Sequence, residues 1–335
     1  MIKIKNISKK IGNFLLKDIN IDINKGEYLI ILGPNGSGKT LLLEILANFK
    51  KYDTGYIESP NKNIGFIYQD LFLFPHLNVY ENIAYSLRIK KIKKDIIKEK
   101  INLISKNLNI KNLLTRDINT LSGGEKQKIA LARALITEPE IFLLDEPTSS
   151  LDNKSKKEIY NILKKIHRET KATFIHVTHD FEEALYLADR VAIINNGELI
   201  QIGTPEEIFK KPNSKFVADF IGFENLYYGE INNHYFITDN DFKIYTELDN
   251  CPKIYATINP KEVIVSKEKL NSSACNNYYG KIINIRKNLN FIELTIDIGI
   301  ILKSIITHHS LELFKFNIND NIWVSFKSNS VIFFI

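Results

Sequence analysis

GPNGSGKT, at residues 33–40, lies between the apolar run YLIIL and the helix-forming stretch LLLEILANF. A glycine-rich turn between a strand and a helix is the arrangement in which backbone N–H groups wrap phosphate oxygens. The three glycines leave no Cβ in the way, and the positive end of the following helix points at the phosphates. The stretch therefore predicts an α/β fold around a phosphate-binding loop. A glycine-rich turn without function is the alternative for this stretch alone.

Every residue of the loop has an expected contact with ATP. Lys39 is placed to reach the β- and γ-phosphates, and the Thr40 hydroxyl is placed to bind Mg²⁺, a hard cation that prefers oxygen ligands. The predicted ATP-binding residues of the loop are Gly33, Pro34, Asn35, Gly36, Ser37, Gly38, Lys39 and Thr40.

A second motif, IFLLDE at residues 141–146, ends in two carboxylates. Its apolar run has the length of a buried parallel strand and delivers Asp145 and Glu146 to the strand's carboxyl end, where open α/β sheets bind ligands. We expect Asp145 to hold Mg²⁺ and Glu146 to orient and polarise the water that attacks the γ-phosphate. A purely structural pair is the alternative, but two buried acids are costly to desolvate without a cation.

A third motif, LSGGEKQ at residues 121–127, opens a stretch whose apolar residues recur at helical spacing. It resembles the signature motif of ABC-type ATPases. The resemblance implies an ABC ATPase domain with a helical subdomain, working as a head-to-tail homodimer. Each ATP would lie between the phosphate-binding loop of one subunit and Ser122, Gly123 and Gly124 of the other. A glycine-containing helix N-cap is the alternative for the motif alone.

The same resemblance implies roles for three further residues. Gln69 matches a glutamine that approaches the metal and senses the γ-phosphate, and its flanking loop touches a membrane subunit in that family. Asp152 ends SSLD, which matches the loop that crosses to the partner's ATP. His179 follows an expected core strand and matches the histidine that contacts the γ-phosphate and helps to hold the water. A lone histidine at a strand end is otherwise more often structural.

The chain departs from the family's pattern at the adenine base. An aromatic residue of the N-terminal hairpin usually stacks on adenine, and the matching position here is Ile11. Phe14 lies three residues later and is the candidate that takes its place. We therefore expect the base to stack on Phe14 in a displaced position, or to make a plain apolar contact.

Composition describes an ordinary globular chain. With 335 residues, 44% of them hydrophobic and 25% charged, two domains are expected. No apolar run approaches the roughly 20 residues that span a bilayer, and the N-terminus lacks the apolar segment of a signal peptide. Cys251 and Cys275 have no metal-ligand spacing. We expect a cytoplasmic protein without disulfides or structural zinc.

Two stretches raise the question of partners. The lysines of residues 90–100 could suggest nucleic acid, but isoleucines interleave with them at helical spacing, and the net charge is only +6. A solvated face of an amphipathic helix is the favoured interpretation. Residues 70–88 carry many apolar and aromatic side chains, which suit a groove that receives a partner's helix, with Phe74, Pro75 and His76 as docking contacts. A buried helical core is the alternative there.

The chain changes character after the helical stretch at residues 205–222. Short β-branched and aromatic runs separated by Asn, Asp, Ser and Gly predict a small all-β, OB-like barrel. The expected domains are therefore residues 1–225, the ATPase domain, and residues 226–335, a regulatory barrel. Trp323 is expected in the barrel core.

Residues 271–335 resemble the molybdate-binding barrel domain of oxyanion-importer ATPases. Where that domain reads Ser-Ala-Arg-Asn, this chain has Cys275 in place of the arginine, which removes a bidentate partner for an oxyanion. The remaining oxyanion contacts that the resemblance implies are Ser273, Asn276, Ser310 and Lys327. Ordinary turn or surface polarity is the alternative for each of them.

Taken over the whole chain, the resemblance implies the ATPase of a molybdate or tungstate importer. ATP and Mg²⁺ would be its cofactors. Its partners would be a second copy, two membrane permease subunits and an extracellular substrate-binding protein, with no nucleic acid, and it would lie peripherally at the cytoplasmic face of the membrane. A sulfate, ferric-ion or polyamine importer would share every ATPase motif. An oxyanion sensor or storage protein, or a soluble ABC ATPase of translation or DNA repair, are alternatives of other classes.

Overall fold

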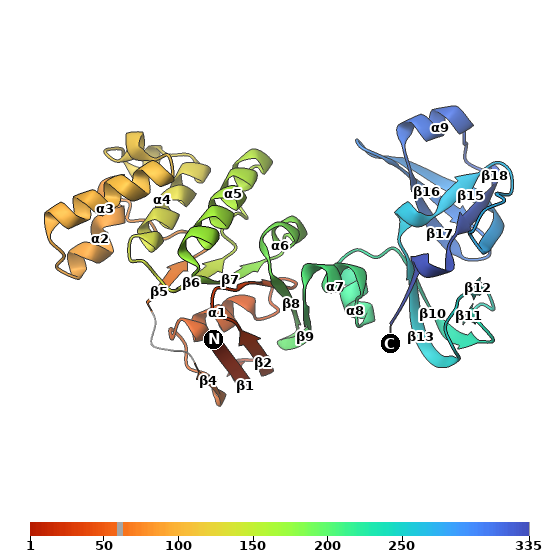
Figure 1. The fold of residues 1–335 in the computed structure, drawn as a ribbon, viewed down its shortest axis with the longest axis horizontal. Helices are drawn as coiled ribbons and strands as arrows, with labels where there is room; N and C mark the ends of the chain where they lie inside the picture. The colour runs from red at the N-terminus through yellow and green to blue at the C-terminus, as the bar shows by residue number, and fades with distance from the viewer. Residues whose placement is uncertain (59–62, 335) are drawn as a thin grey trace. The chain divides into compact units, whose positions relative to one another are not determined.

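The computed structural model describes residues 1–58 and 63–334, and the chain divides into two compact units, Met1–Ile208 and Phe209–Ile335 (Figure 1). The division falls inside α7 (Pro205–Lys210), upstream of the boundary expected between residues 225 and 226. The first strand of the second unit begins at Asn225, so the change from helix to strand lies where the sequence predicts it, whereas α8 (Lys215–Phe220) clusters with the strands that follow it.

The described residues of the first unit form two sheets. Their strands are β1 (Ile2–Ile11), β2 (Phe14–Ile23), β3 (Tyr28–Leu32), β4 (Thr54–Glu58), β5 (Ile64–Ile67), β6 (Ile141–Asp145), β7 (Thr173–Thr178), β8 (Arg190–Asn195) and β9 (Glu198–Gly203). One sheet has the order β2-β1-β4 and is antiparallel. The other has the order β5-β6-β7-β3-β8-β9, with parallel pairing throughout except between β8 and β9.

The central parallel strands of the larger sheet are buried on both faces. All residues of β3, β6 and β7 are buried, which fits the apolar runs of β3 and of residues 141–144, while β7 also buries Thr173, His176 and Thr178. Helix α1 (Lys39–Leu46) contributes Leu41, Leu42 and Ile45 to a core that also contains residues of both sheets. The predicted sequence of strand, loop and helix is therefore confirmed, and α1 fills the space between the two sheets (Figure 1).

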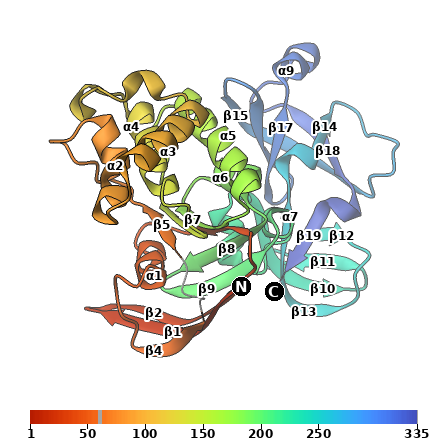
Figure 2. The ribbon, with the colours of Figure 1, turned by 60° about the vertical axis from the view of Figure 1, so that its left-hand side comes forward.

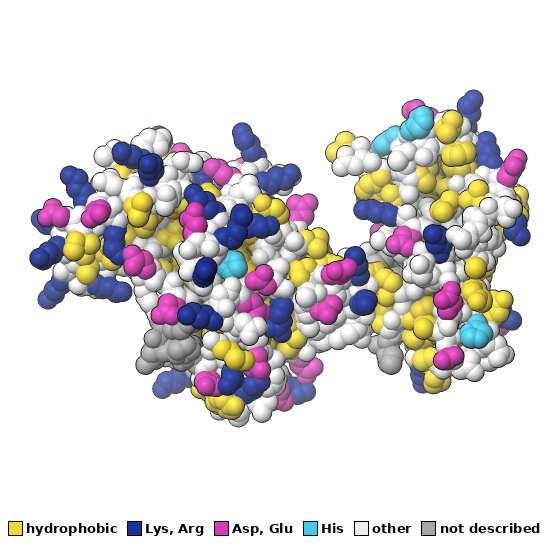
Figure 3. All heavy atoms as spheres, in the orientation of Figure 1, with side chains coloured by type: hydrophobic (Ala, Val, Ile, Leu, Met, Phe, Trp, Pro, Cys, Tyr) yellow, Lys and Arg dark blue, Asp and Glu magenta, His cyan; other side chains and the backbone are white. Residues whose placement is uncertain are grey.

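The remaining helices of the first unit are α2 (Val79–Ile89), α3 (Lys94–Asn107), α4 (Gly123–Leu135), α5 (Asn153–Thr170) and α6 (Phe181–Leu187). Helices α2, α3 and α4 gather in one group on the side of the sheet away from β1 and β2 (Figures 1 and 2). The amphipathic helix predicted from the lysine-rich stretch is confirmed only from Lys94 on, as α3, which buries Ile97 and Ile101. Residues 90–93 lie between α2 and α3, and Ile92 and Ile96 are exposed rather than buried. Acidic side chains lie among the basic ones on the face drawn in Figure 3.

The second unit is all-β apart from short helices. Its strands are β10 (Asn225–Asn232), β11 (Tyr235–Thr238), β12 (Lys243–Tyr245), β13 (Cys251–Ile258), β14 (Ile264–Ser266), β15 (Asn276–Lys287), β16 (Ile292–Asp297), β17 (Ile301–Ile306), β18 (Asn321–Phe326) and β19 (Val331–Phe334). They form two five-stranded antiparallel sheets, β12-β11-β10-β13-β19 and β14-β18-β15-β16-β17, which share one apolar core. The predicted all-β architecture is confirmed. Helix α9 (His308–Phe314) follows β17.

The expectation that Trp323 lies in the barrel core is wrong. Neighbouring residues of a strand point to opposite faces, and β18 turns Ile322 and Val324 inward. Trp323 is half-buried on the outer face, where its ring lies 5.3 Å from that of Tyr279, with the Lys269 ammonium 5.5 Å above it.

Across the described residues, no helix combines the length and apolar character needed to cross a bilayer.

Candidate functional site

Four parallel strands bring the predicted residues to one edge of the large sheet. Strands β5, β6, β7 and β3 are consecutive neighbours and run in the same direction, so their carboxyl ends meet. The segments that follow these strands carry Gln69, Glu146, His179 and the loop at residues 33–38, while Asp145 ends β6. This is the edge at which open α/β sheets bind ligands, as the sequence predicts.

The loop after β3 has a shape that only glycine permits at several positions. Gly36 and Gly38 have φ values of 77° and 102°, which side chains rarely adopt. A Cβ on Gly33 would lie 2.1 Å from the carbonyl oxygen of Ile194, and one on Gly38 would lie 2.8 Å from the ring of Phe14. The loop is therefore pressed against β8 at one end and against Phe14 at the other.

Lys39 opens α1 with its ammonium held beneath the loop. The residue is only 5% exposed, and Nζ donates hydrogen bonds to the carbonyl oxygens of Gly33, at 2.9 Å, and Pro34, at 2.8 Å. Burial lowers the pKa of Lys39, while the nearby carboxylates of Glu146 and Asp145 oppose that shift. Because the Lys39 ammonium is already enclosed by the loop, it can bind phosphate oxygens with little further loss of hydration.

Thr40 and Asp145 place two oxygen donors together. The Thr40 hydroxyl donates to a carboxylate oxygen of Asp145 at 3.1 Å, across 105 residues of sequence. Asp145 is 4% exposed, and burial raises its pKa, with the hydrogen bond from Thr40 opposing the shift. A buried carboxylate whose ionised form is disfavoured gains most from a bound cation, so this pair fits a hard metal ion.

Glu146 follows Asp145 in a left-handed backbone conformation, with φ of 44°. Its N–H donates to the Val177 carbonyl of β7 at 2.9 Å, which fixes the turn against the neighbouring strand. The carboxylate Oε2 lies 3.3 Å from Nδ1 of His179, whose side chain is 53% exposed. The two side chains that the sequence links to water activation are therefore in contact.

Several of these residues line a cavity of about 410 Å³, whereas Gly33, Asp145 and His179 are not part of its lining. Its lining residues are Ile11, Phe14, Asn35, Gly36, Gly38, Lys39, Thr40, Leu41, Gln69 and Glu146. Ile11 and Phe14 line the cavity from the β1–β2 hairpin, and Gln69 lines it from the segment after β5. The lining thus combines apolar with polar and charged side chains, as a base with a phosphate chain requires.

Other predicted ATP contacts lie outside this lining. Ser122 is the N-cap of α4 and forms a capping box with Glu125, in which each side chain accepts from the other's backbone N–H. Gly123 and Gly124 begin the same helix. Asp152 caps α5 and accepts from the N–H groups of Lys154 and Ser155 at 2.9 and 3.0 Å. Within one chain, Ser122 therefore serves as a helix N-cap, which is the alternative stated for the signature motif. Its contact with the ATP of a partner subunit stays a prediction.

The residues considered for an oxyanion do not form one site within this chain. Asn276 is buried, and its amide spans to β12, where its oxygen accepts from the Tyr245 N–H at 2.7 Å and its nitrogen donates to the Tyr245 carbonyl at 3.1 Å. The amide is thus occupied in joining two strands. Lys327 follows the strand that pairs with Asn276, while Ser273 and Cys275 are exposed in the preceding loop.

Ser310 lies at the opposite end of β15 from Asn276. It belongs to α9, whose His308 contacts the carbonyl oxygen of Asn288 at 2.9 Å, just beyond the last residue of β15. The Ser310 hydroxyl shares a hydrogen bond with that of Thr307 at 2.8 Å. A strand of this length keeps its two ends too far apart for a single anion to bridge them.

A buried polar cluster behind the site was missed by sequence reasoning. Glu183 of α6 and His176 of β7 are both 0% exposed, with Oε2 and Nε2 3.4 Å apart. The Tyr28 hydroxyl lies 3.1 Å from Nδ1 of His176, and the Thr148 hydroxyl donates to Glu183. The cluster joins the turn after Glu146 to the helix after His179. A glutamate inside an apolar helical face was the available signal.

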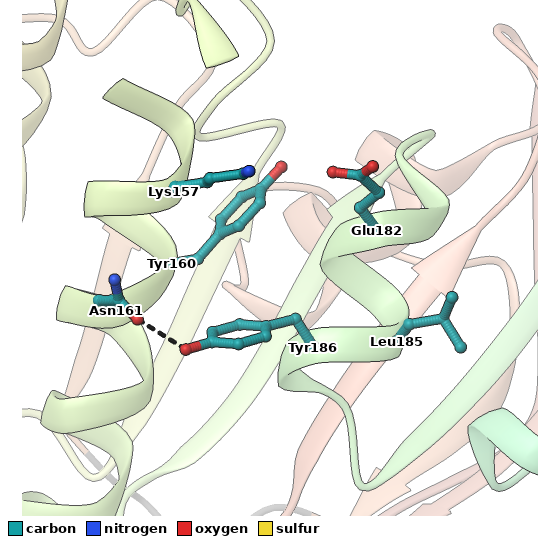
Figure 4. Close-up of a pocket in the computed structure, with 6 residues that line it drawn as sticks. All are labelled: Lys157, Tyr160, Asn161, Glu182, Leu185 and Tyr186. Atoms are coloured by element: carbon teal, nitrogen blue, oxygen red, sulfur yellow. Dashed lines mark hydrogen bonds between the residues drawn. The ribbon is translucent and has the colours of Figure 1, made fainter. Parts of the chain in front are cut away.

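A second cavity of about 400 Å³ lies between α5 and α6 (Figure 4). Lys157, Tyr160 and Asn161 line it from α5, and Glu182, Leu185 and Tyr186 line it from α6, with a hydrogen bond of 2.6 Å from Tyr186 to Asn161. None of these residues was predicted to be functional. The predicted residues Lys39, Thr40, Gln69 and Glu146 line the first cavity instead.

Three comparisons with known proteins agree with this geometry. The family model described as ABC transporter matches residues 16–149. The molybdate/tungstate import ATP-binding protein WtpC of Pyrococcus abyssi is 39% identical over 342 residues, which cover 99% of each chain. The spermidine/putrescine import ATP-binding protein PotA of Borrelia garinii is 46% identical over 242 residues, which cover 68% of this chain and 70% of that protein.

Among solved structures, the dimeric post-hydrolysis state of the ATP-binding cassette MJ0796, bound to ADP and Pi, is 31% identical with a TM-score of 0.56. The match covers 61% of this chain and 99% of the solved chain. The structure of cbiO1 from Clostridium perfringens, part of an ABC transporter complex, is also 31% identical, with a TM-score of 0.58.

Proposed function

Because this chain belongs to the family of ATP-binding subunits of ABC importers, we propose that it energises the uptake of molybdate or tungstate. Its ATP hydrolysis is coupled to transport. The observation that carries the choice of substrate is the extent of the match: similarity to molybdate/tungstate import proteins runs through both units, at 99% of the chain. The polyamine relatives match over a shorter span, 68% of the chain for the two with 46% identity.

ATP fits the first cavity with its phosphates against the loop. The backbone N–H groups of residues 33–38 and the ammonium of Lys39 would hold the β- and γ-phosphates, and the apolar hairpin residues would contact adenine. Glu146 and Gln69 line the same cavity, and the γ-phosphate would lie beside them.

Thr40, Asp145 and Gln69 would hold Mg²⁺. All three offer oxygen, the donor that this ion prefers, and the raised pKa of the buried Asp145 supports the need for a cation there. Bound Mg²⁺ would neutralise charge on the β- and γ-phosphates.

Glu146 would act as the general base that orients and polarises the attacking water. His179 lies 3.3 Å from the Glu146 carboxylate. From there its imidazole would contact the γ-phosphate and help to hold the attacking water. Positioning of this kind, together with charge neutralisation, is what phosphoryl transfer asks of a protein.

A second copy would complete the site. In the proposed head-to-tail homodimer, Ser122, Gly123, Gly124 and Asp152 of one subunit would reach the ATP of the other, since they lie outside the cavity of their own chain. ATP would close the dimer and hydrolysis would open it. Two membrane permease subunits, met by the segment after Gln69 with Phe74, Pro75 and His76, would hold the protein peripherally at the cytoplasmic face of the membrane. An extracellular binding protein would deliver the anion.

Polyamine import is the second candidate, and the higher local identity of 46% to spermidine/putrescine import proteins favours it. The distinguishing experiment is ATPase activity of the chain reconstituted in proteoliposomes with the membrane subunits and binding protein encoded beside it. We expect stimulation by molybdate or tungstate, and none by sulfate or spermidine. Stimulation by spermidine alone would replace the proposed substrate and leave the ATPase in place.

The contribution of Phe14 to nucleotide binding is measurable. Phe14→Ala is expected to raise the Kd for ATP by about fivefold, because loss of an aromatic stacking partner is worth about 1 kcal/mol. Ile11→Ala removes an exposed aliphatic side chain from the same hairpin and should change Kd by only about twofold. Titration with a fluorescent ATP analogue measures both, and a larger effect at Ile11 would move the adenine contact to that residue.

A further inference from the structure

Arg133, near the end of α4, clasps the backbone that follows Gln69. Its Nη1 donates to the Phe72 carbonyl and its Nη2 to the Leu71 carbonyl, each at 2.6 Å. The guanidinium also lies 5.5 Å above the ring of Phe74. The side chain is half-buried, and burial lowers its pKa. A planar fork on two successive carbonyls is a geometry that only arginine provides.

The backbone it holds is in a strained conformation. Leu71 and Phe72 have φ values of 60° and 44°, a left-handed region that residues with a Cβ rarely adopt, here at two consecutive positions. The Leu71 N–H bonds the Tyr68 carbonyl at 3.0 Å, and the Phe72 N–H bonds the Asp70 carbonyl at 2.7 Å. Gln69 lies inside this turn, so the course of the turn decides where its side chain enters the nucleotide cavity.

The other end of α4 carries the signature motif. Ser122 caps the helix, and Arg133 lies eleven residues further on, at about 1.5 Å of rise per residue. One continuous helix therefore bears the motif proposed to meet the partner's ATP and the side chain that holds the turn at Gln69. A displacement of α4 moves both together.

We propose that Arg133 is a positioning residue for ATP hydrolysis. By holding the turn after Gln69, Arg133 keeps the Gln69 side chain at the nucleotide of the same subunit. Because Arg133 and Ser122 belong to one helix, the position of Gln69 depends on the position of Ser122. The proposal rests on the proposed function, because Ser122 serves a nucleotide only in the head-to-tail dimer. Arg133 is not among the residues that line the nucleotide cavity. Arg133 acts through the carbonyl groups of Leu71 and Phe72, which lie between Gln69 and the proposed docking residues that begin at Phe74.

The test compares Arg133→Lys with a matched variant of the same helix. Lys keeps a positive charge but replaces the fork with a single ammonium. Lys128→Met removes a cation from α4 that donates a hydrogen bond to Glu158 of α5 at 2.6 Å. Among the described residues, Lys128 makes no hydrogen bond or ion pair with the turn at residues 68–72. In the full-length protein, we expect Arg133→Lys to lower kcat by about 10²-fold, as a misplaced catalytic group does, with Kd for ATP within about threefold. Lys128→Met should keep the wild-type kcat.

A rescue experiment separates positioning from folding. Glycine adopts positive φ without a Cβ penalty, so Leu71→Gly combined with Arg133→Lys should restore kcat by about tenfold over Arg133→Lys alone. Unchanged kcat in Arg133→Lys, or no recovery in the double variant, would overturn the role of Arg133. So would a joint loss of ATP binding and thermal stability in Arg133→Lys. A wild-type chain that fails to hydrolyse ATP would instead refute the proposed function itself.

Discussion

Glu146→Gln is expected to lower the rate of ATP hydrolysis by about 10²- to 10⁴-fold, the usual contribution of a positioned general base. Glutamine keeps the size of the side chain and can keep the contact with His179, but it cannot accept a proton from water. ATP binding should stay within about threefold of the wild type, because the loop and Lys39 hold the phosphates independently of the base. Single-turnover hydrolysis and equilibrium ATP binding, measured on the same preparation, separate the two effects.

The control for this variant is Glu182→Gln. Glu182 is an exposed glutamate in the first turn of α6, lines the second cavity rather than the first, and so should leave turnover unchanged. Near-normal hydrolysis by Glu146→Gln would remove Glu146 from the role of base. Equal losses of hydrolysis rate in both variants would mean that removing a carboxylate acts through the overall electrostatic potential of the protein, and not through activation of the attacking water.

Glu183→Ala is expected to lower the free energy of unfolding of the first unit by about 3–5 kcal/mol, the range seen when one partner of a buried pair is removed. The substitution leaves His176 and the Thr148 hydroxyl without their acceptor in a region that water does not reach. Glu182→Ala, one residue earlier on the same helix, should change stability by about 0.5 kcal/mol or less. Amide hydrogen exchange of β7 reports the local effect, since two units need not unfold in one step.

The stability from Glu183 should depend on pH in a defined direction. Burial by itself would raise the pKa of Glu183, but His176 and the hydrogen bonds from His176, Thr148 and Thr178 outweigh it and hold the pKa below its ordinary value of 4.5. A depressed pKa contributes stability that is present above pH 4.5 and is lost as the pH falls below it. The difference in β7 exchange between wild type and Glu183→Gln should therefore shrink below that pH. A difference that grows instead would contradict the ionised state of Glu183.

The parts of the fold that sequence predicts are those that local chemistry decides. A continuous apolar run identifies a parallel strand, because both faces of such a strand are buried, and this places Asp145 at a sheet edge without any structure. Glycines at residues 33–38 identify the loop because backbone φ and close approach exclude other residues there. Both signals lie within a few residues of the feature they predict.

Features that depend on contacts between residues far apart in the sequence could not be predicted from local sequence patterns. Arg133 meets its carbonyl partners across 61 and 62 residues, and Glu183 meets Thr148 across 35. The separation of Ser310 from Asn276 follows from the length of β15 and the direction of its partners, which no local pattern encodes. Trp323 shows the same limit on a smaller scale, because its side of the strand depends on the register of β18.

The left-handed backbone of Glu146 has a consequence for the way this chain can change over generations. A residue with a Cβ at φ of 44° is held there against its own preference, and the chain accepts that strain, of order 1 kcal/mol, at the position where the proposed base must lie. Selection for folding alone would favour glycine or asparagine at this position, because both adopt the left-handed conformation readily. Retention of glutamate therefore requires continuous selection for turnover, and a lineage released from transport should lose Glu146 before it loses the surrounding fold.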